Sequence, residues 1–190
     1  MAAAQERADR ARFAALSEEE RREARGGTAA FQDPTTGQVR GTSTARPVRL
    51  LIPRIGVDTD LERLRQDSRG VLVAPALADR AGWWSQGVVP GDVGAAVIVG
   101  HLDTVLGPAV FVRLKQLRPG DTIAVRMSDG RTTRFAVDGS HVVKKALFPS
   151  AAVYGAVPDE QLRLITCSEP FDPVAQSYTD NLVVYATLKA

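Results

Sequence analysis

The sequence is poor in cysteine and histidine, and each shortage excludes a class of protein. The only thiol is that of Cys167, so no disulfide can form within the chain, and metal sites built from several thiolates are excluded. The two histidines, His101 and His141, show no carboxylates at spacings typical of metal ligands. The sequence therefore implies no metal, and nothing in it implies an organic cofactor.

Excess charge and long apolar runs are also missing. The formal net charge is +2, from 24 Lys and Arg against 22 Asp and Glu, so nothing indicates a nucleic-acid partner. The longest apolar run near the middle, residues 93–99, has the length of a strand and falls far below the ~20 residues that cross a bilayer. Residues 1–7 carry charges and no apolar segment, so no secretion signal is recognisable.

Residues 1–45 differ in composition from the rest. Residues 2–25 are rich in Ala, Glu and Arg and are compatible with a solvated helix, and residues 28–44 are polar. We interpret residues 1–45 as a mobile or partly helical tail or linker. Residues 46–190 are then the folded domain.

The folded domain consists of short apolar runs separated by turn signals. Asp129-Gly130 predicts a hairpin turn, and apolar residues spaced three apart in residues 111–117 predict a short helix. Because strands and helices do not alternate, we predict an all-β fold, a closed eight-stranded barrel with one or two short helices. The expected strands are residues 48–52, 55–57, 70–75, 95–99, 122–126, 133–137 with 141–143, 162–167 and 182–186.

Two of these apolar strands end in residues that carry chemistry. His101 follows the run that ends at Gly100, and Cys167 ends the run that begins at Leu162. A thiol attacks an amide only as thiolate, and a neighbouring imidazolium stabilises that thiolate and can protonate the leaving amine. Taken alone, a single cysteine on an apolar strand is by default a small buried hydrophobe. Spacing along the chain does not show that the two side chains meet.

The segments around these residues resemble the two signature segments of sortases. Residues 100–104 (Gly-His-Leu-Asp-Thr) and 164–167 (Leu-Ile-Thr-Cys) occur in the family's order. The resemblance covers residues 46–190 and favours the actinobacterial class F branch. Further matches to that branch lie at residues 52–57, 81–83, 107–111, 117–121 and 178–181.

The resemblance implies a sortase-type barrel that is a cysteine transpeptidase for a Leu-Pro-x-Thr-Gly-like sorting signal in a secreted protein. Cys167 would attack the threonine carbonyl to give a thioacyl enzyme, and His101 would protonate the departing glycine amine. A peptidoglycan precursor or another amine would then take the protein. Thr166 would help to shape the pocket, and the turn with Asp103 and Thr104 would position the imidazole, although an ordinary turn-capping role for the aspartate is equally open.

The chain departs from the family at a third position. Sortases carry an arginine on the strand after the cysteine, which binds the substrate backbone and stabilises the oxyanion, and Thr179 occupies that place here. A threonine hydroxyl cannot replace a five-donor guanidinium, which predicts a weak or substrate-restricted enzyme. Arg163 shares a strand face with Cys167 but lies about 13 Å away at ~3.3 Å per residue. A basic residue from another loop, such as Arg126, Lys144 or Lys145, could take the place of the arginine, but no pattern in the sequence supports it.

Two alternatives and one expectation about location accompany this interpretation. An L,D-transpeptidase would have its histidine and cysteine in one short run, which this chain does not. A degenerate sortase that binds sorting peptides without efficient turnover stays open because of Thr179. The family implies an extracytoplasmic, membrane-associated location, so we expect that an upstream anchor was omitted from this chain. The oligomeric state is not indicated.

Overall fold

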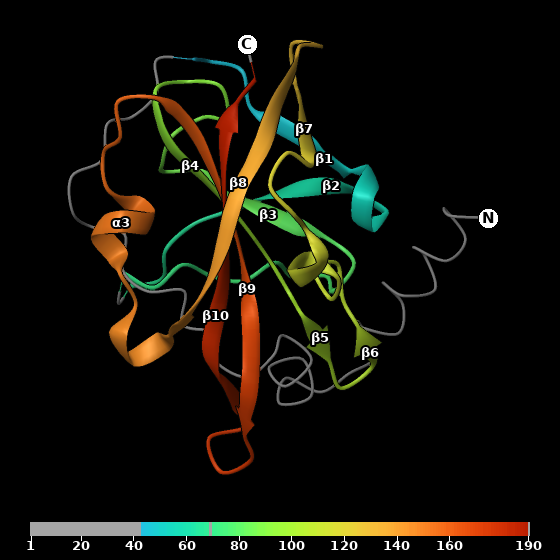
Figure 1. The fold of residues 1–190 in the computed structure, drawn as a ribbon, viewed down its shortest axis with the longest axis vertical. Coiled ribbons are helices and arrows are strands. Elements are labelled where there is room, and N and C mark those ends of the chain that lie inside the picture. Colours follow the sequence, from blue (N-terminus) through green and yellow to red (C-terminus); the bar gives the residue numbers. More distant parts are fainter. Residues whose placement is uncertain (1–42, 69, 190) are drawn as a thin grey trace.

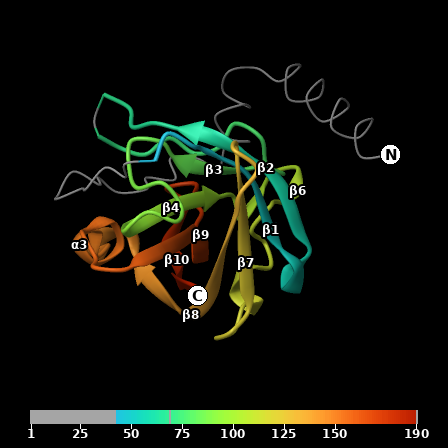
Figure 2. The same ribbon diagram turned by 90° about the horizontal axis from the view of Figure 1, so that it is seen from above.

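The computed structural model describes residues 43–68 and 70–189, and most of them belong to one closed β-barrel. The strands neighbour one another in the order β1-β2-β3-β4-β9-β10-β8-β7 (Figures 1 and 2). This arrangement confirms the predicted all-β fold and the eight-stranded barrel. The strands are β1 (Pro47–Ile52), β2 (Val57–Leu64), β3 (Ala81–Trp84), β4 (Gly94–Gly100), β7 (Thr122–Met127), β8 (Thr132–Lys144), β9 (Glu160–Asp172) and β10 (Ser177–Leu188).

Shorter elements connect these strands. A small two-stranded sheet, β5 (Asp103–Thr104) with β6 (Gly107–Pro108), lies between β4 and β7. Three 3₁₀ turns are η1 (Pro53–Ile55), η2 (Leu114–Gln116) and η3 (Lys145–Leu147), and α3 (Ser150–Tyr154) is a single turn of α-helix. In residues 43–68 and 70–189, no helix has both the length and the apolar character needed to cross a membrane.

Local sequence patterns were right for the hairpin at Asp129-Gly130 and wrong for other segments: residues 55–57 only lead into β2, and β3 was not expected. The hairpin around Asp129-Gly130 is formed by β7 and β8, as predicted. Residues 70–75 do not form a strand, because Gly70 adopts a positive φ of 80° and the segment closes back on β2 through bonds such as Val73 N–H to the Arg65 carbonyl. The helix expected in residues 111–117 is only the 3₁₀ turn η2 with preceding turns. Of the predicted tail, residues 1–42 lie outside the described residues.

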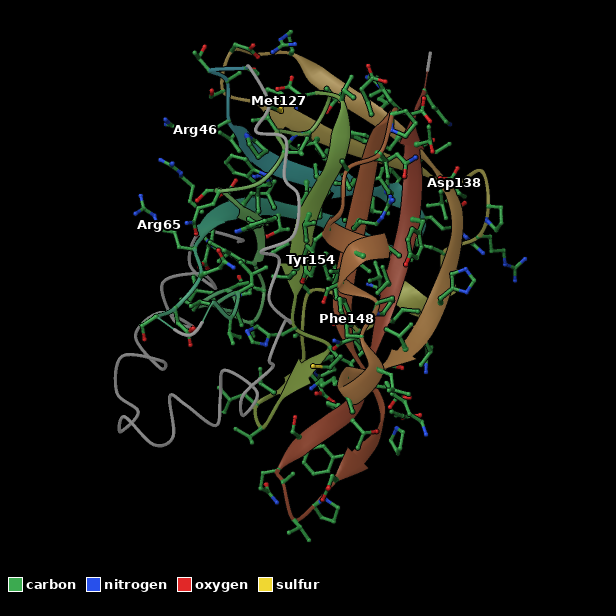
Figure 3. The ribbon with its side chains drawn as sticks, turned by 90° about the vertical axis from the view of Figure 1, so that its left-hand side faces the viewer. Arg46, Arg65, Met127, Asp138, Phe148 and Tyr154 are labelled. Carbon is green, nitrogen blue, oxygen red and sulfur yellow. The ribbon has the colours of Figure 1, made fainter. Side chains whose placement is uncertain are left out.

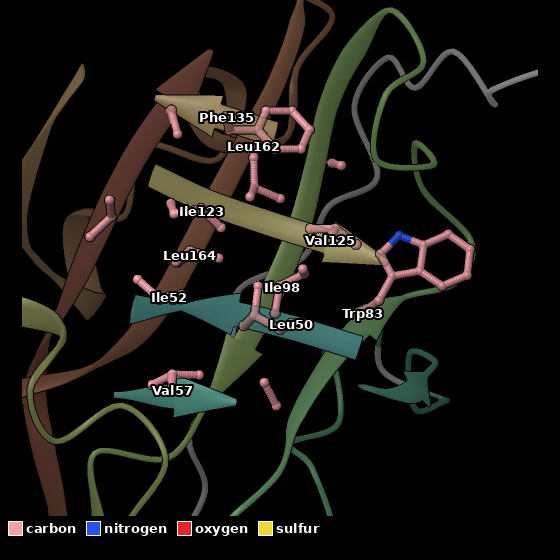
Figure 4. Packing of buried hydrophobic residues seen from close by; sticks show 14 of the residues in the cluster. Leu50, Ile52, Val57, Trp83, Ile98, Ile123, Val125, Phe135, Leu162 and Leu164 are labelled. Atoms are coloured by element: carbon pink, nitrogen blue, oxygen red, sulfur yellow. The ribbon is translucent and has the colours of Figure 1, made fainter. Parts of the chain in front are cut away.

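The barrel interior is filled by alternate residues of the strands. Leu50 and Ile52 of β1, Ile123 of β7 and Leu164 of β9 are fully buried and belong to one cluster (Figure 4). Their spacing of two along each strand follows from the alternation of side chains across a pleated sheet. Each such aliphatic side chain contributes about 1.5–3 kcal/mol by leaving water, so this interior is the main source of rigidity.

A second cluster covers the outer face of β4 and β9. Ile98 of β4 belongs to the barrel interior, whereas Val99 belongs to the outer cluster with Val153 and Tyr154 of α3. Tyr154 and Phe148 lie together beside α3 (Figure 3), with their ring centroids 5.9 Å apart. Because all seven residues of β4 are buried, its end is held from both sides.

Candidate active site

The parallel pairing of β4 and β9 brings the two candidate catalytic residues to neighbouring strand positions. Gly94 pairs with Glu160 and the register runs without a shift to the pair Val99 with Ile165. His101 and Cys167 each lie two residues beyond that last pair. Neighbouring strands are about 4.8 Å apart, so both residues lie at the same end of the barrel.

The backbone and one ring nitrogen of His101 are fixed by neighbouring loops. The His101 carbonyl accepts a hydrogen bond from the Phe111 N–H at 2.9 Å. The residue is buried, with 5% of its surface exposed, and its Nε2 lies 2.9 Å from the Pro75 carbonyl oxygen. A carbonyl can only accept, so Nε2 carries the hydrogen and Nδ1 is the nitrogen that can gain or lose a proton.

The glycine before His101 allows a close contact that holds this loop. A Cβ atom at Gly100 would lie 2.6 Å from Cδ2 of Phe111 and 2.7 Å from Cγ1 of Val110. Real Cβ atoms do not approach side-chain carbons so closely, so only glycine lets the segment after β6 pack on the end of β4. The histidine that follows is therefore placed by packing as well as by hydrogen bonds.

Cys167 is partly buried on β9, and two opposite charges act on its sulfur. Burial raises the pKa of the thiol, and the negative charge of Asp103 raises it further. The ammonium of Lys145 hydrogen-bonds the sulfur and lowers the pKa, without cancelling the effect of burial. The thiol is therefore mostly protonated at neutral pH when no substrate is present.

Asp103 links the turn after His101 to β10. Its Oδ2 accepts a hydrogen bond from the hydroxyl of Tyr178 at 2.6 Å. Burial raises the pKa of the Tyr178 phenol, and the bond to Asp103 raises it further, so the phenol keeps its proton for this contact. Tyr178 also packs edge to face with Phe171, with ring centroids 5.2 Å apart. The role of Asp103 in orienting the imidazole stays a prediction.

Lys145 lies beside the thiol, and the sequence had named it only as one of three basic residues that could replace the missing arginine. It follows the last residue of β8, and its Nζ donates a hydrogen bond to Oγ of Ser177 on β10 at 3.2 Å. The Ser177 hydroxyl in turn donates to the Tyr178 carbonyl at 3.2 Å. The only signal available beforehand was a basic pair at the end of a strand, which is common on protein surfaces.

The two supporting threonines occupy different environments. Thr166 is fully buried, and its Oγ1 has no hydrogen-bond partner in the described part of the chain. Along β9 it alternates with Cys167 and so faces the barrel interior with Leu164. Thr104 accepts a hydrogen bond from the Leu106 N–H at 3.2 Å, as a residue that stabilises a tight turn does.

The residue at the expected arginine position does not point at the thiol. Thr179 is exposed, and its hydroxyl lies 3.2 Å from the Pro170 carbonyl, to which it donates, and 2.9 Å from Oδ1 of Asp180. A register irregularity between β9 and β10 falls at this position. At the position where the sequence analysis expected an arginine, the side chain is therefore a neutral hydroxyl.

Arg163 contacts Tyr185 and Gln161 and not Cys167. Its guanidinium carbon lies 4.5 Å from the centre of the Tyr185 ring, and its Nη2 donates to Oε1 of Gln161 at 2.5 Å. Burial lowers the pKa of this guanidinium. Arg163 shares the outer face of β9 with Cys167 but is held away from it, as the sequence-based distance suggested. In the described residues, no three His, Cys, Asp or Glu side chains cluster as metal ligands would.

His101, just after β4, and Cys167, within β9, thus lie on neighbouring parallel strands of a closed eight-stranded barrel. The sortase domain family profile matches residues 50–189, which is most of the chain. The chain therefore belongs to the sortase family. No curated protein sequence matched it.

Solved structures of sortases share the fold at low sequence identity. Sortase A from Corynebacterium diphtheriae has a TM-score of 0.59 and 23% identity over 76% of this chain, which spans 62% of that protein. Sortase C-1 from Actinomyces oris has a TM-score of 0.55 and 25% identity, covering 76% of this chain and 75% of that one. The pilus-related sortase C of Group B Streptococcus has a TM-score of 0.60 and 18% identity, covering 96% of each chain.

Proposed function

We propose that this protein is a cysteine transpeptidase that cleaves a Leu-Pro-x-Thr-Gly-like sorting signal and transfers the acyl part to an amine. Its substrates are secreted proteins with a C-terminal sorting signal, and its acceptor is a peptidoglycan precursor or another amine. The observation that carries this proposal is the neighbouring placement of His101, just after β4, and Cys167, within β9, in a chain of the sortase family.

The proposed reaction proceeds in two halves through a thioacyl enzyme. In the first half Cys167 Sγ bonds to the threonine carbonyl carbon, the bond from that carbon to the glycine nitrogen breaks, and His101 gives the departing amine its proton. In the second half an incoming amine gives a proton to His101 and displaces the sulfur, which restores the amide and the thiol. The raised pKa of Cys167 means that a minority thiolate form, paired with a protonated imidazole, carries the first attack.

Peptide cleavage tests this proposal directly. The chain is incubated with a quenched fluorescent sorting peptide, with and without an amine acceptor, and acyl-enzyme and products are followed by mass spectrometry. We expect an adduct on Cys167 and, with acceptor present, a transpeptidation product. Cys167→Ala should abolish both signals, and His101→Ala should lower turnover by orders of magnitude. Cleavage that persists in Cys167→Ala would contradict the proposal.

We also propose that the protein belongs to class F and works outside the cytoplasm behind a membrane anchor. The class assignment is supported by the ordered motifs between residues 52 and 181. The location is supported by family membership, because the substrates of sortases are exported proteins. Fractionation of cells that express the native locus, with detection of the protein in the membrane fraction, tests the location.

A sortase-like protein that binds sorting peptides without efficient turnover is the second candidate function. Thr179, which donates to the backbone instead of facing the thiol, favours it. Under this alternative, wild-type protein and Cys167→Ala would bind the peptide equally by calorimetry. Neither would release the glycine fragment.

A further inference from the structure

The structure places a cation opposite the position where the arginine is missing. Strands β8 and β10 are antiparallel, and their register reaches the pair of Lys144 with Asp180. If this register is continued by one residue, Lys145, which follows β8, stands opposite Thr179 of β10. The positive charge that is missing at position 179 is therefore replaced by that of a lysine directly across from it.

The contacts of Lys145 turn its ammonium toward the cysteine. Nζ donates to Ser177 Oγ at 3.2 Å and hydrogen-bonds the Cys167 sulfur. Lys145 is partly buried, whereas Lys144 beside it is exposed. The two lysines therefore differ in direction although they are adjacent in sequence.

An unpartnered amide beside the thiol is an independent sign that this place takes a polar ligand. Asn181 pairs with Cys167 across β9 and β10, and directly paired residues of antiparallel strands share a face. Its side chain is fully buried, and neither Oδ1 nor Nδ2 has a hydrogen-bond partner among the described residues. Leaving such groups unpaired costs about 1–3 kcal/mol, which a bound peptide backbone would recover.

We propose that Lys145 is a catalytic residue that supplies, from the end of β8, the positive charge that other sortases place on the strand after the cysteine. This inference rests on the proposed function. As Sγ bonds to the carbonyl carbon, the carbonyl oxygen becomes an oxyanion, and a Lys145 N–H donates to it while the ammonium keeps its proton. Before attack, the same ammonium stabilises the Cys167 thiolate. Ser177 is a positioning residue that holds Nζ in place.

Under this proposal Lys145 supplies a positive charge but not the two parallel hydrogen bonds that an arginine can make. An ammonium is a point charge on a flexible stem and cannot bind two oxygens in parallel as a guanidinium does. We therefore expect Lys145 to support the rate of acylation more than the affinity for the peptide. Its loss should lower kcat with little change in KM.

The test compares Lys145→Gln with Lys144→Gln as the matched control. We measure kcat and KM for the sorting peptide, and the pH dependence of Cys167 alkylation by iodoacetamide without substrate. Lys145→Gln should lower kcat about 10²-fold or more, the cost of one lost oxyanion donor. It should also move the alkylation profile to higher pH, because a charge that favours the thiolate is removed. Lys144→Gln should change neither, and Lys145→Arg should retain most of both.

The alkylation profile reports the thiol against its other charged and titratable neighbours. These are Asp103 after β4 and Tyr178 on β10, with Glu169 acting on Tyr178 and His101 on the neighbouring strand, and none of them is altered in either variant. If Lys145→Gln fails to fold, as judged by circular dichroism, Ser177→Ala replaces it. That variant should shift the profile in the same direction by a smaller amount.

The outcomes distinguish this inference from the proposed function. If wild type turns over and Lys145→Gln matches Lys144→Gln in kcat and in the alkylation profile, the role of Lys145 is overturned and the transpeptidase function stands. A fall in kcat with an unchanged profile would also overturn it. If wild type does not cleave the peptide, the proposed function is overturned, and an unshifted alkylation profile in Lys145→Gln then overturns the role of Lys145 as well.

Discussion

At the scale of single residues, the reactivity of Cys167 depends on a carboxylate and an ammonium that act in opposite directions. Asp103 and burial favour the neutral thiol, and Lys145 favours the thiolate. Burial has the largest effect and, with Asp103, keeps the thiol mostly protonated at neutral pH. The balance can be shifted in either direction by a substitution that removes one charge.

Asp103→Asn should shift the balance toward thiolate. Removing the negative charge lowers the pKa of Cys167, so alkylation at a fixed pH near 8 should become faster and its profile should move to lower pH. Tyr178→Phe is the control, because it removes the 2.6 Å hydrogen bond and leaves the carboxylate charge in place. If the alkylation profile of Asp103→Asn is unchanged or moves to higher pH, the Asp103 carboxylate does not raise the pKa of Cys167.

Thr179→Arg should rescue Lys145→Gln. If a cation at position 145 or at position 179 can stabilise the same oxyanion, an arginine at position 179 should restore part of the lost kcat in the double variant, about tenfold. It should also raise the activity of the otherwise wild-type protein. Thr179→Gln, which has similar polarity and no charge, is the control. Equal rates for the arginine and glutamine variants would show that charge at this position is irrelevant.

The residues of the site were predictable to different degrees. His101 and Cys167 follow apolar runs in segments that resemble family signatures, so sequence alone was enough to propose them. Lys145 was not predictable, because its place beside the thiol depends on the register between β8 and β10. The arrangement of Asn181 opposite Cys167 likewise requires knowledge of which strands pair.

At the scale of elements, β4 is the strand that sets the position of the histidine. Both of its faces are buried, and Gly100 lets the loop around Phe111 close over its end. The sequence revealed the strand through its continuous apolar run. It did not reveal α3, because a single turn with Val153 and Tyr154 buried has no helical periodicity to detect.

Gly100→Ala should damage both stability and the site. The new methyl group would meet Phe111 and Val110 at 2.6–2.7 Å, and overpacking of this kind costs about 1–3 kcal/mol. We expect a lower denaturation midpoint and a fall in kcat, because His101 must shift with the loop. Gly139→Ala on β8 is the matched control, since no atom lies within 4 Å of its added methyl group. Equal stability of the two variants would contradict the packing role of Gly100.

At the scale of the whole molecule, the barrel interior is the source of stability. Local patterns predicted most of the strands, because most apolar runs are bounded by their own turn signals, but they wrongly included residues 70–75 and missed β3. The order around the barrel was beyond local patterns, since β4 lies next to β9 and β1 closes on β7 although long stretches of sequence separate the partners. Such pairings depend on which strands can bury their inner faces together.

Ile123→Ala should destabilise the whole barrel without touching the site directly. Ile123 is fully buried on β7, and removal of its side chain should lower the free energy of unfolding by about 2–5 kcal/mol, measured by urea denaturation. Val174→Ala, at a position with 93% exposure, should change it by less than about 0.5 kcal/mol. A comparable loss in both variants would contradict the assignment of the core.

The parallel contact between β4 and β9 has a consequence for when the enzyme becomes reactive. The whole of β5, β6, β7, β8 and α3 lies between these two strands in the chain, so their ends meet only after that long excursion has folded back. A nascent or partly folded chain therefore carries an ordinary, unassisted thiol. The proposed nucleophile and proton donor therefore come together only in a chain in which β4 and β9 have paired across this long stretch of sequence.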